Sequence, residues 1–325
     1  MNDVLATFKL PDNSDNVWLG NEEAGVPPYV LSDDIIIALK VSLVTRRPLL
    51  ISGPPGSGKT MLAKAVAEAQ GWSYLKHTLT SRSRLEDLTS EIDQLQRLHD
   101  AHAASAGPGD ELMPEWAYLK PGLFWWGFDA DSAVRKGHTA KDVAEQKGFR
   151  IPQKPKTLRE EAKGVVILLD EIDKAEPDLP NDLLEPLDLR CFQLPDGNEV
   201  RAPDELTLLV MITTNGERDL PTAFLRRCIH LDLQSQDEEG LKRIADFHFK
   251  AKEHSQKPAV FAAVAKKFKD LVSETKTAGR RPPGTSEYLD AVRACLELGI
   301  TPDSDIWKQV EQATLKKQTK QEGTL

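Results

Sequence analysis

Short, continuous apolar runs divide the first two thirds of the chain. Runs of this length without alternation are typical of strands that are buried on both faces, as in a parallel sheet. The pattern predicts five strands, and the run after Gly164 has the character of a central parallel strand. The continuous stretches lie at 48–51, 165–169 and 206–212, and the other two predicted strands are 73–78, where the alternation is imperfect, and 228–233.

Helical spacing of apolar residues fills the stretches around the first strand. A helix is predicted over 33–45, where Ser32 precedes two acidic residues in the first turn. A second helix is predicted over 59–70, because Gly71 stands where a helix stops. Leucine and isoleucine then recur every three or four residues over 85–98. This stripe predicts one amphipathic helix, packed either internally or against a neighbouring subunit.

From residue 234 onward the pattern is helical only. Proline residues punctuate four apolar-periodic stretches, which predicts a second, all-helical unit of the chain. The stretches are 237–253, 259–273, 285–299 and 304–316.

These patterns set the expected organisation. An irregular lead-in is expected over 1–30, a nucleotide-binding domain over 31–234, a helical lid over 235–318 and a polar tail over 319–325. Insertions are expected near 82–126 and 129–163. Three of the six tryptophans lie in the first insertion. We interpret this aromatic segment as core, with a loop that grips a substrate as the alternative.

The stretch that carries the clearest chemistry directly follows the first predicted strand. Residues 53–60 fit G-x-x-x-x-G-K-[ST] in full, between an apolar run and a helical pattern. Backbone N–H groups of such a loop point at phosphate oxygens, Lys59 would reach the β- and γ-phosphates, and Thr60 would bind Mg²⁺. The expected phosphate-binding residues are Gly53, Pro54, Pro55, Gly56, Ser57, Gly58, Lys59, Thr60 and Met61. The alternative is a glycine turn that only joins a strand to a helix.

Two carboxylates end the most apolar strand. Asp170 and Glu171 follow Val165–Leu169, at what should be the functional edge of a parallel sheet. Asp170 would hold Mg²⁺, and Glu171 would polarise the water that attacks the γ-phosphate. Asn215 follows the next apolar run and could hydrogen-bond the γ-phosphate and that water, or could simply form a turn with Gly216.

Composition narrows the classes of function. The 325 residues carry a formal charge of −9, which disfavours sequence-independent binding to nucleic acid or to an anionic membrane. No apolar run approaches the roughly 20 residues of a membrane helix, so membrane insertion is not expected. Residues 1–13 do not resemble a signal peptide, so we expect a cytoplasmic protein. The three cysteines lack the spacing of a disulfide framework or a zinc site.

With these parts in order, the chain resembles the AAA+ ATPases, and within them the MoxR-like group. The resemblance covers roughly residues 25–315. It is carried by the loop 53–60, by Leu-Leu-Asp-Glu-Ile-Asp-Lys-Ala over 168–175, by Thr-Thr-Asn over 213–215, by Ala-Phe-Leu-Arg-Arg-Cys over 223–228 and, less specifically, by Lys-Pro-Gly-Leu-Phe over 120–124. It implies an αβα sandwich with a five-stranded parallel sheet, followed by a helical lid.

The resemblance also implies roles for individual residues. Asn215 resembles the first sensor residue, and Arg227, with Arg226 as the second candidate, resembles the arginine finger that reaches a neighbouring subunit's γ-phosphate. A surface salt bridge is the alternative for both arginines. The usual second sensor arginine at the start of the third lid helix is missing. Arg280 or Arg281 is its candidate replacement, and the alternative is that the role is lost.

The function implied is Mg²⁺-dependent ATP hydrolysis in a ring, of six subunits by resemblance, that remodels a client protein. The group often works with a partner bearing a von Willebrand factor A domain, which we expect to be a separate protein here. One alternative is a motor that remodels nucleic acid. Another is a nucleotide-dependent switch with little turnover. A small-molecule kinase would share the phosphate loop but would not need the helical lid.

Overall fold

The computed structural model describes residues 8–11, 16–106, 112–250, 257–277, 281–302 and 304–316. They form two compact units. The sheet unit contains residues 33–51 and 66–231, and the lid unit contains residues 16–32, 52–65 and those from 232 onward. Among the described helices, none has the length and apolar character that crossing a membrane requires.

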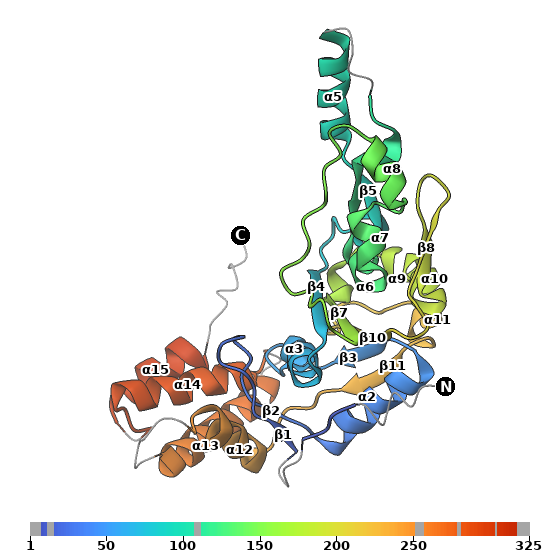
Figure 1. Ribbon diagram of the computed structural model, residues 1–325. Helices are drawn as coiled ribbons and strands as arrows, with labels where there is room; N and C mark the ends of the chain where they lie inside the picture. The colour runs from blue at the N-terminus through green and yellow to red at the C-terminus, as the bar shows by residue number, and fades with distance from the viewer. Residues whose placement is uncertain are drawn as a thin grey trace, which may run out of the picture. The chain divides into compact units, whose positions relative to one another are not determined.

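A five-stranded parallel sheet is the centre of the sheet unit, as the sequence predicts (Figure 1). The strand order is β11-β3-β10-β7-β4. Both β3 and β7 pair with β10, so the carboxyl ends of these three strands lie at one edge of the sheet. The strands are β3 (Leu49–Ser52), β4 (Ser73–Thr78), β7 (Gly164–Asp170), β10 (Thr207–Thr213) and β11 (Ile229–Asp232).

Strand β7 is buried along its whole length, which explains its unbroken apolar sequence. Alternate residues of a strand face opposite sides of a sheet. Val165, Ile167 and Leu169 belong to one large hydrophobic cluster, so Val166 and Leu168 face the other side of the sheet. Helix α6 (Leu123–Phe128) contacts β7 and β4, and helix α2 (Asp33–Thr45) contacts β10.

The aromatic segment is part of this core. Phe124 and Trp125 are fully buried, and Trp126 and Phe128 nearly so. Gly127 lies so close to the sheet that a Cβ there would be 2.5 Å from Cδ1 of Ile167. The interpretation as core is therefore confirmed, and the alternative of a loop that grips a substrate is wrong for these side chains.

The prediction of one amphipathic helix over 85–98 is wrong. The structure has α4 (Leu85–Leu88), strand β5 (Ser90–Ile92) and α5 (Gln94–Ala106). The hydroxyl of Thr89 donates to the carbonyl of Leu85 where α4 ends, and β5 then pairs with β6 (Leu119–Pro121). The pairing with a distant strand overrides the local helical spacing.

The remaining elements of the sheet unit are short. The stretch 129–163, expected as a surface excursion with some helix, contains α7 (Ala130–Val134) and α8 (Ala140–Glu145). A hairpin of β8 (Cys191–Gln193) and β9 (Glu199–Arg201) was not predicted. The others are η1 (Glu115–Tyr118), η2 (Ile172–Lys174), α9 (Leu179–Asp182), α10 (Leu184–Leu189) and α11 (Thr222–Leu225).

The lid unit contains the predicted four helices around a core of their own. They are α12 (Glu238–His248), α13 (Lys257–Thr277), α14 (Thr285–Leu298) and α15 (Trp307–Thr314). Within the lead-in, expected to be irregular, β1 (Val17–Trp18) pairs antiparallel with β2 (Tyr29–Val30). The expected tail over 319–325 lies outside the described residues.

Candidate nucleotide site

Three glycines give the loop after β3 its shape. Gly53, Gly56 and Gly58 have φ angles of +146°, +80° and +94°, in the region that side chains disfavour. A Cβ on Gly53 would also lie 2.6 Å from the carbonyl oxygen of Leu233. Such backbone turns the N–H groups of consecutive residues inward, which makes a concave site for an anion.

The side chains of the loop fit a phosphate ligand. Lys59 is buried, and its Nζ donates to the carbonyls of Gly53 at 2.7 Å and Pro54 at 3.1 Å, so the ammonium group lies inside the loop. The hydroxyl of Ser57 is buried without a hydrogen-bond partner among the described residues. Helix α3 (Lys59–Gln70) begins here, and the first N–H groups of a helix attract anions. Thr60 and Met61 belong to this first turn.

The lid packs directly on the loop within the lid unit. The N–H of Ser286 donates to the carbonyl of Gly56 at 3.2 Å. A Cβ on Gly284 would lie 2.4 Å from the carbonyl oxygen of Pro55. Glu287 caps α14 by accepting from the N–H of Gly284 and the hydroxyl of Ser286. The start of α14 therefore holds the outer side of the loop.

The candidates for the second sensor lie just before this contact. Arg281 is exposed, and its Nη2 is 3.9 Å from Oε1 of Glu287. Arg280 lies outside the described residues. The role of either arginine stays a prediction.

The lead-in also reaches the loop. Tyr29 donates from its hydroxyl to the carbonyl of Gly58 at 3.4 Å, and Lys64 of α3 donates to the carbonyl of Gly25 at 3.0 Å. Burial raises the pKa of Tyr29, so the phenol keeps its proton and donates. Tyr29 is a residue that sequence reasoning missed, since an isolated tyrosine in an irregular stretch carries no motif.

In the sheet unit, Asp170 ends β7, and each of its carboxylate oxygens contacts a polar side chain. Its Oδ1 accepts from the hydroxyl of Thr213 at 2.6 Å, and its Oδ2 is 2.7 Å from Nζ of Lys76. Asp170 is almost fully buried, so two partners offset the cost of burying its charge. Sequence reasoning gave no role to Thr213 or Lys76. Thr213 ends β10 and Lys76 lies in the carboxyl half of β4, and this position on the two neighbours of β7 is the signal that could have indicated a role.

Glu171 follows in the left-handed conformation, with φ of 64°. Its N–H donates to the hydroxyl of Thr213 at 2.9 Å, and its carboxylate is 2.9 Å from Nζ of Lys174. A non-glycine residue in this conformation is uncommon and is often found at functional sites. The turn carries the Glu171 side chain out of the buried strand, and the carboxylate is about one third exposed.

The loop of Asn215 is organised by a buried carboxylate. Oδ2 of Asp173 accepts from the N–H groups of Asn215 at 3.2 Å and Glu217 at 3.0 Å. Asp173 is only 3 % exposed. It therefore ties the end of β10 to η2 beside Asp170 and Glu171. The structure brings together these three predicted residues, Asp170, Glu171 and Asn215, around Thr213 and Asp173.

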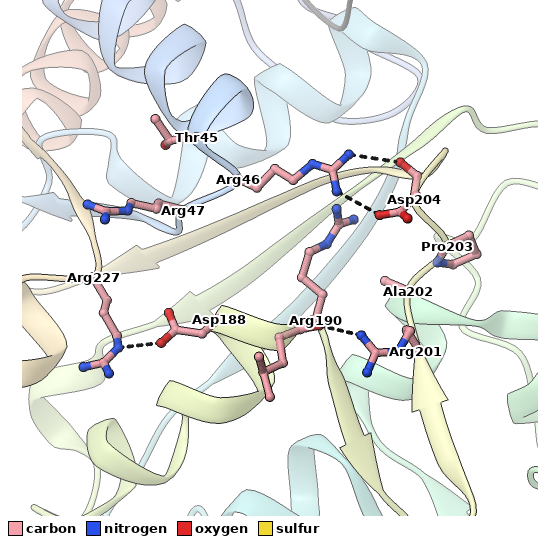
Figure 2. Close-up of a pocket in the computed structure, with 11 residues that line it drawn as sticks. Thr45, Arg46, Arg47, Asp188, Arg190, Arg201, Ala202, Pro203, Asp204 and Arg227 are labelled. Atoms are coloured by element: carbon pink, nitrogen blue, oxygen red, sulfur yellow. Dashed lines mark hydrogen bonds and ion pairs between the residues drawn. The ribbon is translucent and has the colours of Figure 1, made fainter. Parts of the chain in front are cut away.

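The two arginines after α11 differ in their surroundings. Both are exposed. Nε of Arg227 is 2.5 Å from Oδ2 of Asp188, in an ion pair on the surface (Figure 2). The Arg226 side chain has no ion-pair or hydrogen-bond partner in the part of the chain that the structure describes. Both the surface salt bridge and the finger, which the sequence left as alternatives for Arg227, fit this geometry, because an exposed pair exchanges readily.

Comparison with known proteins identifies the family. Residues 48–228, more than half of the chain, match the AAA domain of the dynein-related subfamily. The chain belongs to this AAA family. The match begins at the strand before the phosphate loop and ends just after Arg227, so it includes every predicted site residue apart from Arg280 and Arg281.

Two curated proteins resemble the AAA chain at low identity. Lon protease 1 of Hydrogenovibrio crunogenus (strain DSM 25203 / XCL-2) is 27 % identical over 216 residues, which are 64 % of this chain and 20 % of that protein. Lon protease of Rickettsia prowazekii (strain Madrid E) is 26 % identical over 217 residues, 65 % of this chain and 21 % of that protein. The chain thus matches about a fifth of the length of each.

Proposed function

We propose that this AAA protein is an Mg²⁺-dependent ATPase that assembles into a ring and remodels a client protein. The observation that carries the proposal is the loop 53–60, in which three glycines with positive φ surround the buried ammonium group of Lys59. This geometry supports the binding of a nucleoside triphosphate. The preference for ATP rests on the family.

The residues divide the chemistry between them. Lys59 would bind the phosphates, and Thr60 and Asp170 would hold the Mg²⁺ ion, which neutralises charge on the β- and γ-phosphates. Glu171 would accept a proton from the attacking water, since its carboxylate is partly exposed and its backbone is fixed by Thr213. Asn215 would orient that water or the γ-phosphate.

Assembly into a ring would complete the site with Arg227 of a neighbouring subunit. Light scattering on Glu171→Gln, with and without ATP, tests this, because the variant should keep ATP bound. We expect a mass of several subunits with ATP, and six by resemblance. Arg227→Ala should then lose hydrolysis, whereas Arg97→Ala, which removes a surface ion pair with Glu115, should not. A monomer at all concentrations would contradict the ring.

The client is proposed to be a protein. Both curated relatives are named proteases, and the chain is acidic overall, which disfavours a nucleic acid. Membership of the MoxR-like group, and a partner with a von Willebrand factor A domain, are further proposals from the resemblance of 168–175 and 120–124. DNA-stimulated hydrolysis with a steep salt dependence would favour a nucleic-acid motor instead. A cytoplasmic location stays a prediction.

A second candidate is a nucleotide switch with little turnover. The ion pair between Lys76 and Asp170 favours it, because Lys76 competes with Mg²⁺ for the carboxylate. Lys76→Gln should then raise the affinity for Mg²⁺ and the rate of phosphate release. ATP binding without phosphate release, in the assembled protein, would establish the switch.

A further inference from the structure

Apart from the candidate nucleotide site, the sheet unit has a charged cavity at the amino ends of its strands. It has a volume of about 740 Å³ and is lined by residues before β3, β10 and β11 and by the ends of α10 and β9 (Figure 2). Asp170 and Glu171 lie at the carboxyl end of β7, at the opposite edge of the sheet. Five guanidinium groups line the cavity, against the carboxylates of Asp188 and Asp204. The arginines are Arg46, Arg47, Arg190, Arg201 and Arg227.

Two of these arginines lack a carboxylate partner among the described residues. Arg46 pairs with Asp204 at 3.0 Å, Arg227 with Asp188, and Arg201 with Glu199. Arg47 and Arg190 form no such ion pair within the described ranges. The whole chain is acidic, so the amino-acid composition does not explain this local excess of unpaired positive charge.

Arg190 is the most confined of the five. Its Nη2 donates to the carbonyl of Leu206 at 3.0 Å, but its buried Nε has no hydrogen-bond partner in the described structure. Burial and the neighbouring Arg46 lower its pKa, while Asp204 opposes the shift. Arg190 and Arg46 also have positive φ angles, of 53° and 55°. An unsatisfied buried donor in a charged cavity indicates a missing acceptor.

We propose that this cavity is a phosphate-binding site in which Arg47 and Arg190 are the ligands and Arg227 completes the rim. Guanidinium groups recognise phosphate through paired, charge-assisted hydrogen bonds. The phosphates come either from a nucleotide bound to a neighbouring copy of this chain or from a free phosphorylated ligand. The first source rests on the ring proposed above, and the second does not.

The proposed cavity site is tested in a variant whose phosphate loop no longer binds phosphate. Lys59→Ala removes binding at the loop, and inorganic tripolyphosphate is then titrated calorimetrically. We expect binding that weakens with salt. Adding Arg190→Gln or Arg47→Gln should weaken it about tenfold, since each removes a charge-assisted contact. The matched control Arg97→Gln should leave it unchanged. Asp204→Asn, which removes an exposed opposing charge, should strengthen it.

Two results would contradict the proposed phosphate site. Equal affinity of the Arg47→Gln, Arg190→Gln and Arg97→Gln proteins would do so, as would no binding of tripolyphosphate by Lys59→Ala. Arg47 is exposed, so its variant keeps the test valid should Arg190→Gln fail to fold.

A mixing experiment distinguishes the two sources. Lys59→Ala subunits have an intact cavity but bind no nucleotide at the phosphate loop. Arg190→Gln subunits bind nucleotide at the loop but have an impaired cavity. A mixture that hydrolyses ATP faster than the sum of its parts assigns the phosphates to a neighbouring copy. Tripolyphosphate binding without such recovery assigns the cavity to a free phosphorylated ligand. An inactive wild-type protein that still binds tripolyphosphate would refute the proposed function and keep the site.

Discussion

The hydroxyl of Thr213 donates a hydrogen bond to Oδ1 of Asp170 over 2.6 Å. Oγ1 of Thr213 also accepts a hydrogen bond from the N–H of Glu171 at 2.9 Å. One buried side chain on β10 therefore fixes the carboxylate of Asp170 and the backbone of Glu171, the residue that follows β7. Thr213 positions the proposed Mg²⁺ ligand and the proposed base.

Thr213→Val tests this role, because valine has nearly the same shape and no hydroxyl. The change removes the hydrogen bonds that the Thr213 hydroxyl makes with Oδ1 of Asp170 and with the N–H of Glu171, so the free energy of unfolding should fall by about 1–3 kcal/mol. Phosphate release should slow more than ATP binding weakens. Thr213→Ser keeps the hydroxyl and should restore most of the rate. Equal rates for the valine and serine variants would contradict a positioning role.

Gly284→Ala tests the contact between the lid and the phosphate loop. The added Cβ would lie 2.4 Å from the carbonyl oxygen of Pro55, and backbone must move to make room. We expect about tenfold weaker ATP binding by calorimetry and a loss of stability of about 1–3 kcal/mol. Ser286→Ala is the control, since the N–H of residue 286 still reaches Gly56. Unchanged affinity for Gly284→Ala would contradict a role of the lid in shaping the loop.

Asp188→Asn tests whether the proposed arginine finger, Arg227, needs its ion pair with Asp188. The ion pair with Arg227 is about 40 % exposed on each side, so its loss should change the free energy of unfolding by less than about 1 kcal/mol. Arg227 stays charged and available, so ATP hydrolysis of the assembled protein should persist. Arg227→Ala should lower that rate about a thousandfold. Loss of activity to the same extent in both variants would indicate that the pair itself is needed.

The sequence predicted the sheet because β3, β7 and β10 are largely buried on both faces, and β7 is apolar without interruption. It predicted the loop 53–60 because the phosphate site is local in sequence. It failed over 85–98, where β5 pairs with a strand about 30 residues away and local periodicity carries no sign of it. It also missed Thr213, Asp173 and Arg190, whose roles arise only when separate strands and loops meet.

Lys136 provides a test of stability against pH. It is buried, and its Nζ donates to the carbonyl of Ala117 and lies 5.0 Å from the Phe149 ring. Burial lowers its pKa from 10.5 to about 8, Asp93 opposes this shift and Arg150 adds to it. Between pH 8 and 10.5 the unfolded chain holds a proton that the folded protein releases. Stability should therefore rise with pH in this window.

Lys136→Met should remove this contribution. The free energy of unfolding of the variant minus that of the wild type should fall by about 2 kcal/mol from pH 7 to pH 10.5, with solvent screening allowed for. Denaturant unfolding at the two pH values measures it, with Lys141→Met on α8 as the control for loss of an exposed lysine. If the difference in the free energy of unfolding between variant and wild type does not change with pH, burial does not lower the pKa of Lys136.

The most direct test of the account is phosphate release from ATP by the wild type and by Glu171→Gln at saturating Mg²⁺ and ATP. The account predicts steady release by the wild type. It predicts ATP binding of similar affinity in the variant, with release slowed about a hundredfold or more, since a positioned base contributes this much. Release by Glu171→Gln at the wild-type rate, or none by a wild type that binds ATP, would contradict it.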